Sequence, residues 1–224
     1  MEKIAVLIDS TSFLSEELKK ELDIRTVYLN IVINNHSYKE IIDMTADKYY
    51  EYLRDTNNSF PTTSQPAIGE VVACLEKLKE DGYTDVIAIA LSSGISGACS
   101  SYTVAGLMVD GINVHPFDSE VSCKPEGWYA IKAANLIKEG KNSNQIISAL
   151  NEMKKVSKAY FMADDLSHLQ RSGRLSGAQA VVGSLLQVKP LLHFDNKVIV
   201  PFQKIRTYKK VVSRMYELFD EYYK

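Results

Sequence analysis

A run of serine and glycine residues near the middle of the chain has the composition of an anion-binding loop. Residues 91–101 read Leu-Ser-Ser-Gly-Ile-Ser-Gly-Ala-Cys-Ser-Ser, and Asp85–Ala90 before them is apolar enough for a short strand buried on both faces. A helix that starts in this run leaves the backbone N–H groups of its first turn without intrahelical partners. Such a helix start binds anions. The run therefore predicts a receptor for one phosphate or carboxylate group.

The same run leaves two other functions open. Residues 94–98 read Gly-Ile-Ser-Gly-Ala, one residue type short of the G-x-S-x-G elbow of serine hydrolases. Asp118 and His168 follow in the chain order of that fold, so a small serine hydrolase with Ser96 as its nucleophile is one alternative. The run lacks the lysine of a P-loop and the spacing of G-x-G-x-x-G. A nucleotide- or phosphate-binding regulatory domain is the other alternative.

A second polar segment, at residues 62–66, reads Thr-Thr-Ser-Gln-Pro and precedes an expected helix. Proline favours the start of a helix, so these side chains either cap that helix or belong to a binding site. We expect residues 56–66 to be a loop without regular structure. Asp164 and Asp165 precede His168 by about one helical turn, a spacing that could suggest a metal site. A capping role for Asp165 explains the same spacing, so we expect no metal site.

Alternating strands and helices predict an α/β fold with a parallel sheet. We expect strands at residues 4–8, 27–33, 85–90, 113–117 and 159–163. We expect helices at residues 15–22, 45–54, 68–80, 98–109, 126–138 and 143–155. Ligands bind beyond the carboxyl ends of the strands in such sheets. The polar residues after three of these strands, at 9–11, 92–97 and 118–119, should therefore converge on one crevice.

The pattern changes after residue 163 and predicts a second, smaller α/β domain. Residues 171–178 read as a polar loop that opens a helix, and residues 188–194 and 197–202 as a hairpin around Asp195 and Asn196. Residues 208–223 read as a final amphipathic helix. We therefore expect a parallel-sheet domain over residues 1–160 and a smaller α/β domain over residues 161–224.

Composition and charge indicate which class of protein and which partners to expect. The 224 residues are 46% hydrophobic and carry a net charge of −2, so we expect no affinity for nucleic acid. Residues 164–224 hold 10 Lys and Arg against 6 Asp and Glu, a basic excess that suits an acidic partner. Three cysteines without a CxxC pair indicate a reducing compartment, and no apolar run approaches a membrane span. We expect a cytoplasmic protein without integral membrane association.

Taken together, these segments resemble the DegV family of bacterial lipid-binding proteins. The motifs that carry the resemblance are Ile8-Asp9-Ser10-Thr11, Thr63-Ser64-Gln65-Pro66, residues 91–97, Asp118-Ser119, residues 169–174 (Leu-Gln-Arg-Ser-Gly-Arg), and Lys189-Pro190 followed by Arg206-Thr207. Each motif is short, but the set covers the whole chain in order.

The resemblance implies a two-domain α/β protein that buries one long-chain fatty acid, such as palmitate, stearate or oleate, between its domains. Such a protein resembles the acyl-carrying subunit of the bacterial fatty acid kinase system. The carrier needs no cofactor and catalyses no reaction itself. A separate ATP-dependent kinase phosphorylates the carboxylate of the bound fatty acid, and the acyl-phosphate feeds phospholipid synthesis.

By motif, the resemblance also implies roles for individual residues. The hydroxyl groups of Thr63 and Ser96 would hold the carboxylate, with Ser64, Ser93 and Gly97 alongside.

Further roles follow for three arginines of the second domain. Arg171 would contact the head group or the partner, and Arg174 and Arg206 are further candidates for the kinase surface. Family members usually continue past the last helix with more strands, so the second domain is incomplete relative to them.

Overall fold

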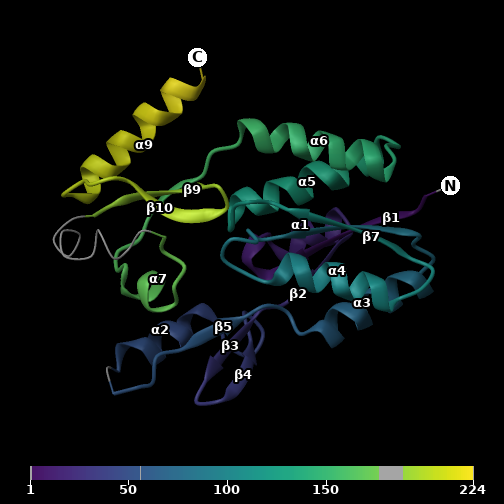
Figure 1. Ribbon diagram of the computed structural model, residues 1–224, viewed down its shortest axis with the longest axis horizontal. Coiled ribbons are helices and arrows are strands. Elements are labelled where there is room, and N and C mark those ends of the chain that lie inside the picture. Colours follow the sequence, from purple (N-terminus) through teal and green to yellow (C-terminus); the bar gives the residue numbers. More distant parts are fainter. Residues whose placement is uncertain (1, 56, 177–188, 224) are drawn as a thin grey trace. The chain divides into compact units, whose positions relative to one another are not determined.

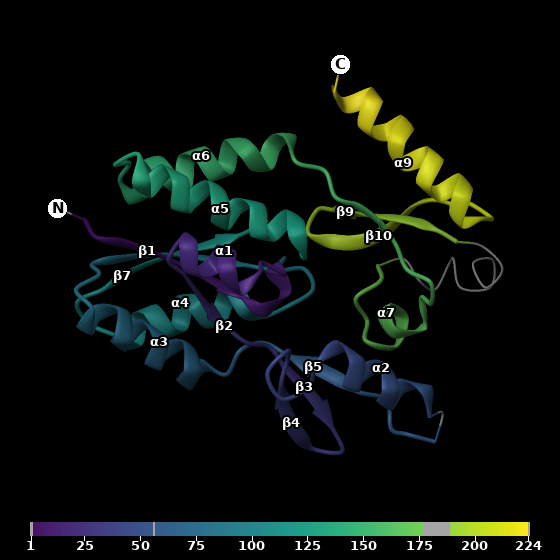
Figure 2. The ribbon, with the colours of Figure 1, turned by 180° about the vertical axis from the view of Figure 1, so that it is seen from behind.

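The computed structural model describes residues 2–55, 57–176 and 189–223. The chain forms two compact units, Met1–Val156 and Ser157–Lys224, shown from opposite sides in Figures 1 and 2. The predicted boundary lies at residue 160, close to this division. Each unit is described by itself below.

A parallel four-stranded sheet forms the centre of the first unit, as the sequence predicts. Its strands, in spatial order, are β2 (Ile24–Val27), β1 (Ile4–Asp9), β6 (Asp85–Ala90) and β7 (Asn113–Asp118). All three neighbouring pairs are parallel. Every residue of β1 and β6 is buried, which is typical of central strands covered on both faces.

Helices cover both faces of this sheet (Figures 1 and 2). On one face lie α3 (Ile68–Glu80) and α4 (Ala98–Met108), and on the other α5 (Lys124–Lys138) and α6 (Ser143–Val156). A short helix, α1 (Glu16–Glu21), begins at Ser15, whose hydroxyl accepts a hydrogen bond from Leu18 N at 3.3 Å. The helix predicted to start at residue 15 is confirmed.

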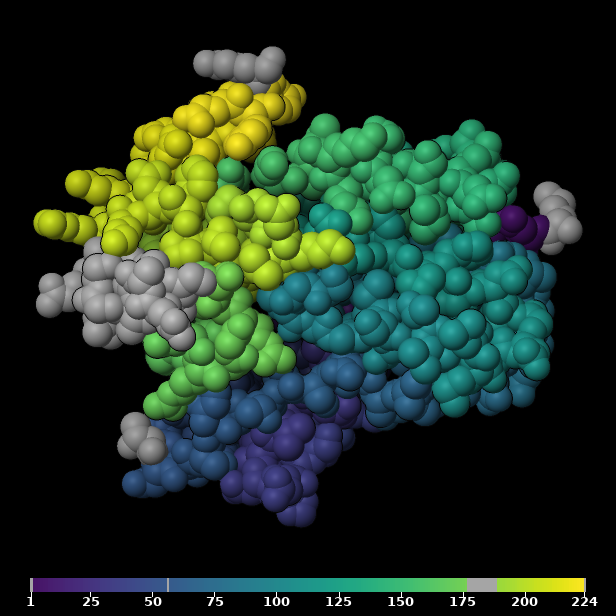
Figure 3. Space-filling view, in the orientation of Figure 1, coloured from purple at the N-terminus to yellow at the C-terminus, as the bar shows by residue number. Residues whose placement is uncertain are grey.

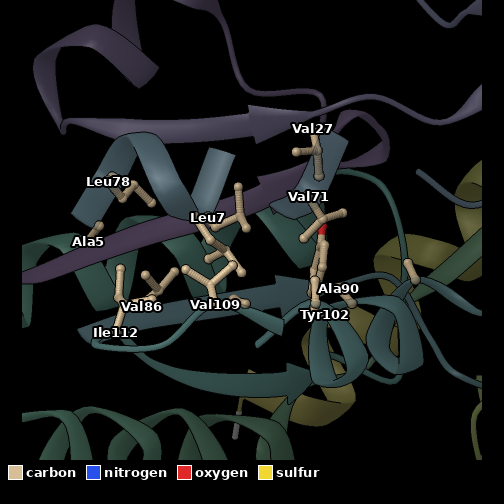
Figure 4. Packing of buried hydrophobic residues seen from close by; sticks show 14 of the residues in the cluster. Ala5, Leu7, Val27, Val71, Leu78, Val86, Ala90, Tyr102, Val109 and Ile112 are labelled. Atoms are coloured by element: carbon tan, nitrogen blue, oxygen red, sulfur yellow. The ribbon is translucent and has the colours of Figure 1, made fainter. Parts of the chain in front are cut away.

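The hydrophobic core between the sheet and the α3–α4 layer draws on alternate strand residues. Leu7 of β1 and Ala90 of β6 point into it, together with Val71 of α3 and Tyr102 of α4 (Figure 4). This period of two places the other strand residues toward α5 and α6. The packing fixes the ends of the strands, and with them the loops that follow.

The strand order changes direction between β1 and β6. From β1 the chain passes to β2 on one side, whereas from β6 it passes to β7 on the other side. Ligands in open α/β sheets bind beyond the carboxyl ends of the strands at such a switch point. The topology therefore directs attention to the loops that follow Asp9 and Ala90.

A small antiparallel sheet corrects two predictions. It consists of β4 (His36–Lys39), β3 (Asn30–Ile33) and β5 (Thr62–Ser64), and α2 (Ala46–Arg54) lies between β4 and β5 in the chain. The predicted single strand over residues 27–33 is wrong in part, because Val27 ends a strand of the parallel sheet and Asn30–Ile33 forms a separate strand that pairs elsewhere. The predicted loop over residues 56–66 is also wrong in part, because Thr62–Ser64 pairs with Asn30–Val32.

The second unit contains an antiparallel sheet and two described helices. The strand predicted at residues 159–163 belongs to this sheet and not to the parallel one, since Tyr160–Met162 pairs antiparallel with Leu191–His193. Its sheet order is β10 (Val198–Gln203), β9 (Leu191–Asp195) and β8 (Tyr160–Met162), with α7 (Ser167–Arg171) and α9 (Tyr208–Tyr223). The predicted hairpin is confirmed, and its turn residues Asn196 and Lys197 have positive φ angles. The helix predicted to open after residue 178, and the first residue of the strand predicted at 188–194, lie outside the described residues.

The last helix, α9, packs one side into the second unit. Val211 and Leu218 are buried in a small core with Leu191 and Ile205. Its opposite side contributes to the surface seen in Figure 3, where α9 is coloured yellow. None of the helices in the described part of the chain is long and apolar enough to cross a membrane.

Candidate functional site

The three polar loops meet at the carboxyl end of the parallel sheet, as the sequence predicts. Asp9, the last residue of β1, accepts a hydrogen bond on Oδ2 from the backbone N of Leu91 at 2.9 Å. Asp118, the last residue of β7, accepts one on Oδ1 from the backbone N of Ser93 at 3.0 Å. Two carboxylates on the neighbouring strands thus hold the loop after β6 from both sides.

This loop makes a tight turn that presents Ser96 at the start of α4. The carbonyl oxygen of Ser92 accepts hydrogen bonds from the backbone N of Ile95 and of Ser96, both at 3.1 Å. The Ser96 Oγ accepts from the backbone N of Ala98 at 3.2 Å. A hydroxyl group has one proton as well as its lone pairs. Because Ser96 is an acceptor in this contact, its proton remains available to a ligand.

Ser93 has a different arrangement. Its Oγ donates to Asp118 Oδ2 at 2.5 Å, and the backbone N of Glu120 donates to Asp118 Oδ1 at 3.1 Å. The single proton of the Ser93 hydroxyl therefore points at a carboxylate of the protein. In this arrangement Ser93 anchors the loop, and Ser96 is the better placed donor for an anion.

The end of β5 lies beside the start of α4. Gly97 packs against the side chain of Gln65, and a Cβ at position 97 would lie 3.2 Å from the Gln65 Cδ atom. Thr63 and Ser64 directly precede Gln65, and both are exposed on β5, where Thr63 pairs with Ile31. The structure thus brings the 63–65 segment to Gly97, although the two lie more than 30 residues apart in the sequence.

The three candidate arginines belong to the second unit. Arg171 ends α7 and is exposed. Arg174 follows Gly173, which has a φ angle of +73°, and its Nη1 donates to the carbonyl oxygen of Ser172 at 2.6 Å. Arg206 is exposed between β10 and α9 and lines a cavity of about 390 Å³.

The first unit gives little support to a serine hydrolase. His168, the histidine of the predicted hydrolase triad, lies on α7 of the second unit, whereas Ser96 and Asp118 belong to the first unit. His115 Nε2 lies 2.9 Å from Asp85 Oδ1, at the start of β6 and so at the opposite end of the strand from Ser96. His36 lies on β4 and is exposed. Asp118, the acid of a hydrolase triad, accepts from Ser93. Among the described residues of this unit, neither histidine is placed to activate Ser96.

A buried pair of acids is the feature that the sequence analysis did not single out. Asp9 and Glu126 are both fully buried, and Thr11 Oγ1 lies between them, 2.6 Å from Asp9 Oδ1 and 2.7 Å from Glu126 Oε2. Burial raises the pKa of both carboxyl groups, and burial with the charge of Asp9 raises the pKa of Glu126 especially far.

Gly127 explains how Glu126 reaches this position. A Cβ at Gly127 would lie 2.8 Å from the carbonyl oxygen of Ser12, so a larger residue would push α5 away from the segment after β1. In the sequence, the feature that could indicate the burial of Glu126 is a Glu-Gly pair in the first turn of a helix. This pair by itself is a weak indication. Within the described ranges, no group of three or more His, Cys, Asp or Glu side chains is placed to hold a metal ion.

Comparison with protein families relates the chain to one group. Residues 3–224 match the family described as "Uncharacterised protein, DegV family". The protein named DegV from Bacillus subtilis is 56% identical over 219 residues, which are 97% of this chain and 77% of the relative. A DegV domain-containing protein of Listeria innocua is 48% identical over 98% of this chain and 77% of its own length.

Solved structures share the fold. The crystal structure of DegV from Bacillus subtilis, described as a fatty acid binding protein, superposes with a TM-score of 0.91 at 55% identity and covers 99% of this chain and 78% of that chain. A fatty acid binding DegV family protein from Streptococcus agalactiae has a TM-score of 0.90 at 29% identity, with coverages of 99% and 78%.

Proposed function

This chain belongs to the DegV family, and we propose that it binds one long-chain fatty acid and presents it to a separate kinase. The observation that carries the proposal is the start of α4, where the Ser96 hydroxyl has its proton available and the Thr63–Gln65 segment lies alongside. The fatty acid binding described for the relative at 55% identity supports the same ligand class.

The site suits a carboxylate. Thr63 and Ser96 each supply one hydroxyl donor, Ser64 and Gly97 lie beside them, and the first turn of α4 adds backbone N–H groups and the positive end of a helix dipole. A carboxylate removed from water needs such partners, because burying it without them is very costly. These donors are neutral, so they leave the carboxylate oxygens nucleophilic toward a phosphoryl group.

The acyl chain supplies the affinity. A C16 fatty acid such as palmitate buries roughly 14 methylene groups at about 0.8 kcal/mol each, or about 11 kcal/mol in total. This exceeds much of the cost of association, which is estimated at roughly 4–15 kcal/mol. Stearate and oleate belong to the same class. Hydrophobic transfer thus drives binding, and the hydroxyl groups determine which end of the ligand is held.

The proposed partner is an ATP-dependent fatty acid kinase that forms an acyl-phosphate for phospholipid synthesis, so the carrier itself is not an enzyme. The second unit offers it basic side chains, since the cavity near Arg206 is also lined by Lys204 and Lys210, whereas the charge of Arg214 is paired with Glu217 and Glu221. Complementary charge increases the rate of association with an acidic partner. Cys74, Cys99 and Cys123 form no disulfide bond among the described residues, which fits the proposed cytoplasmic location.

Replacing Arg171 with alanine should lower acyl-phosphate formation by the kinase at least tenfold, because truncating an arginine that is a hot spot of an interface costs about 2 kcal/mol or more. Palmitate binding and the unfolding temperature should stay within error. Arg54→Ala, at another exposed helix end, is the matched control. The assay follows ATP consumption by the kinase with the palmitate-loaded protein. Equal turnover for the Arg171 and Arg54 variants would remove Arg171 from the partner surface.

A comparison of two ligands tests the carboxylate site. We expect palmitate to displace a bound fluorescent fatty acid at least tenfold more strongly than hexadecanol, which has the same chain length but no charge. Equal displacement would show that the head group makes no specific contact. Failure of both ligands would show that the chain has no acyl pocket.

A further inference from the structure

Two buried carboxyl groups share one hydroxyl group at the end of β1. Thr11 Oγ1 lies within hydrogen-bond distance of one oxygen of Asp9 and of one oxygen of Glu126, at 2.6 and 2.7 Å. The threonine hydroxyl has a single proton and can donate it to only one of them. The other contact would bring two unprotonated oxygen atoms together unless a carboxyl group carries a proton. The two distances therefore require two protons among three oxygen atoms, which are Thr11 Oγ1, Asp9 Oδ1 and Glu126 Oε2.

The surroundings of Glu126 agree with a proton on one of the two carboxyl groups. Its side chain is fully buried, and its Oε1 atom has no hydrogen-bond partner among the described residues. The charge of the nearby Asp9 further raises the pKa of Glu126. An ionised, buried and partly unpaired carboxylate is very costly, whereas a neutral carboxyl group can donate a hydrogen bond to an acceptor beside it.

We propose that Asp9 and Glu126 hold a single proton between them, with Glu126 neutral and Asp9 ionised, and that this pair positions the Ser92–Gly97 loop. The Glu126 carboxyl donates to Thr11, and Thr11 donates to Asp9. The Asp9 carboxylate then accepts from the backbone N of Leu91 and so fixes the residue from which the loop begins. The positioning part of this inference rests on the proposed function; the location of the proton does not.

Donor counting assigns the charge to Asp9. Its two oxygens receive hydrogen bonds from Leu91 N, from Thr11 N at 3.0 Å and from Thr11 Oγ1. Three donors favour the ionised form of a carboxyl group. Among the described residues, the Glu126 carboxyl has only the contact with Thr11, so its neutral form costs less.

The titratable groups that are coupled to the pair bring no positive charge to it. Tyr102 of α4, Glu40 after β4 and Cys123 before α5 act electrostatically on the pair, and all three are acids. None of these three can supply a positive charge to stabilise a second carboxylate. The two carboxyl groups titrate as one coupled unit.

The proton gives a definite dependence of stability on pH. The pKa of Glu126 in the folded chain is raised above its ordinary value of 4.5, so the folded state retains a proton that the unfolded state loses. The stability that this neutral group contributes is complete below pH 4.5 and decreases as the pH rises toward the folded-state pKa. Glutamine is isosteric and does not titrate. The free energy of unfolding of Glu126→Gln should therefore increase relative to wild type as the pH rises from 5 to 8.

The direct test is a carboxyl ¹³C NMR titration of the full chain labelled in Glu and Asp, with Glu126→Gln and Asp9→Asn to assign the signals. We expect the Glu126 carboxyl to have the chemical shift of a protonated acid at pH 7 and Asp9 that of a carboxylate. An ionised Glu126 at pH 7, or a proton on Asp9 instead, would overturn the assignment. This measurement needs no ligand, so it is independent of the proposed function.

The two isosteric variants then test positioning. Asp9→Asn places an amide donor where Leu91 N and Thr11 need acceptors, so we expect a lower unfolding temperature and at least tenfold faster release of palmitate. Glu126→Gln keeps a donor toward Thr11, so the rate at which this variant releases palmitate should change far less than in Asp9→Asn. This rate should also no longer vary with pH. Equal effects of both variants on release would overturn positioning by the pair. A wild-type protein without palmitate would instead count against the proposed function.

Discussion

Replacing Thr63 and Ser96 with alanine together should weaken palmitate binding about 100-fold or more, with about tenfold or more for each single change. A hydrogen bond to a charged group contributes about 1.5–3 kcal/mol, and each 1.4 kcal/mol is a factor of ten in affinity. Ser96 has its proton available at the start of α4, and Thr63 is exposed on β5 two residues from the Gln65 contact with Gly97. Displacement of a fluorescent fatty acid measures the effect.

Thr103→Ala provides the control for this prediction. Thr103 lies on α4 and is exposed, and its hydroxyl donates to the carbonyl oxygen of Cys99 in its own helix at 3.1 Å. Its loss should leave palmitate affinity within about twofold. If the double variant binds palmitate as tightly as Thr103→Ala does, the carboxylate is held elsewhere.

Replacing Leu75 with alanine should lower the free energy of unfolding by about 2–5 kcal/mol, the range for large-to-small changes in packed cores. Leu75 is fully buried where α3 packs on the parallel sheet, in the cluster that contains Leu7 and Tyr102. Domains have a total stability of only about 5–15 kcal/mol, so this loss is a large share of it. Urea unfolding measured by circular dichroism determines the change.

Leu107→Ala is the matched control in the neighbouring helix. Leu107 lies on α4 with 82% of its surface exposed, so its truncation removes little buried area and should cost less than about 0.5 kcal/mol. A loss at Leu75 no larger than the loss at Leu107 would contradict the packing of α3 on the sheet.

Local pattern was sufficient to predict three of the four parallel strands, β1, β6 and β7, and the convergence of their loops. Largely apolar runs such as Asp85–Ala90 identify central strands, and the serine and aspartate residues after them mark the carboxyl ends. Because parallel strands place their carboxyl ends at one edge, the meeting of Asp9, Ser93 and Asp118 follows from topology.

The small antiparallel sheet could not be predicted in this way. Alternation over residues 27–33 is the same whether the strand is continuous or changes partner, because the pattern reports one buried side and not the neighbouring strand. Thr62–Ser64 has no buried residue at all. Only pairing with Asn30–Val32 makes it a strand, and that pairing depends on tertiary structure.

Glu126 illustrates a second limit of sequence reasoning. A glutamate in the first turn of a helix normally interacts with the helix dipole at the surface. Its burial depends on Gly127, which allows α5 to approach the backbone of Ser12, and on Thr11, which comes from a segment more than 100 residues earlier. Neither contact leaves a periodic signal in the sequence.

Mass spectrometry of the chain purified from a bacterial host, first under native and then under denaturing conditions, tests the central claim most directly. We expect the native protein to be heavier by the mass of one long-chain fatty acid, and denaturation to release that mass, because the ligand is not covalently bound. The increment also identifies the length and unsaturation of the acyl chain. A protein that carries no such mass, and gains none after incubation with palmitate or oleate, would contradict the proposal that this chain carries a fatty acid.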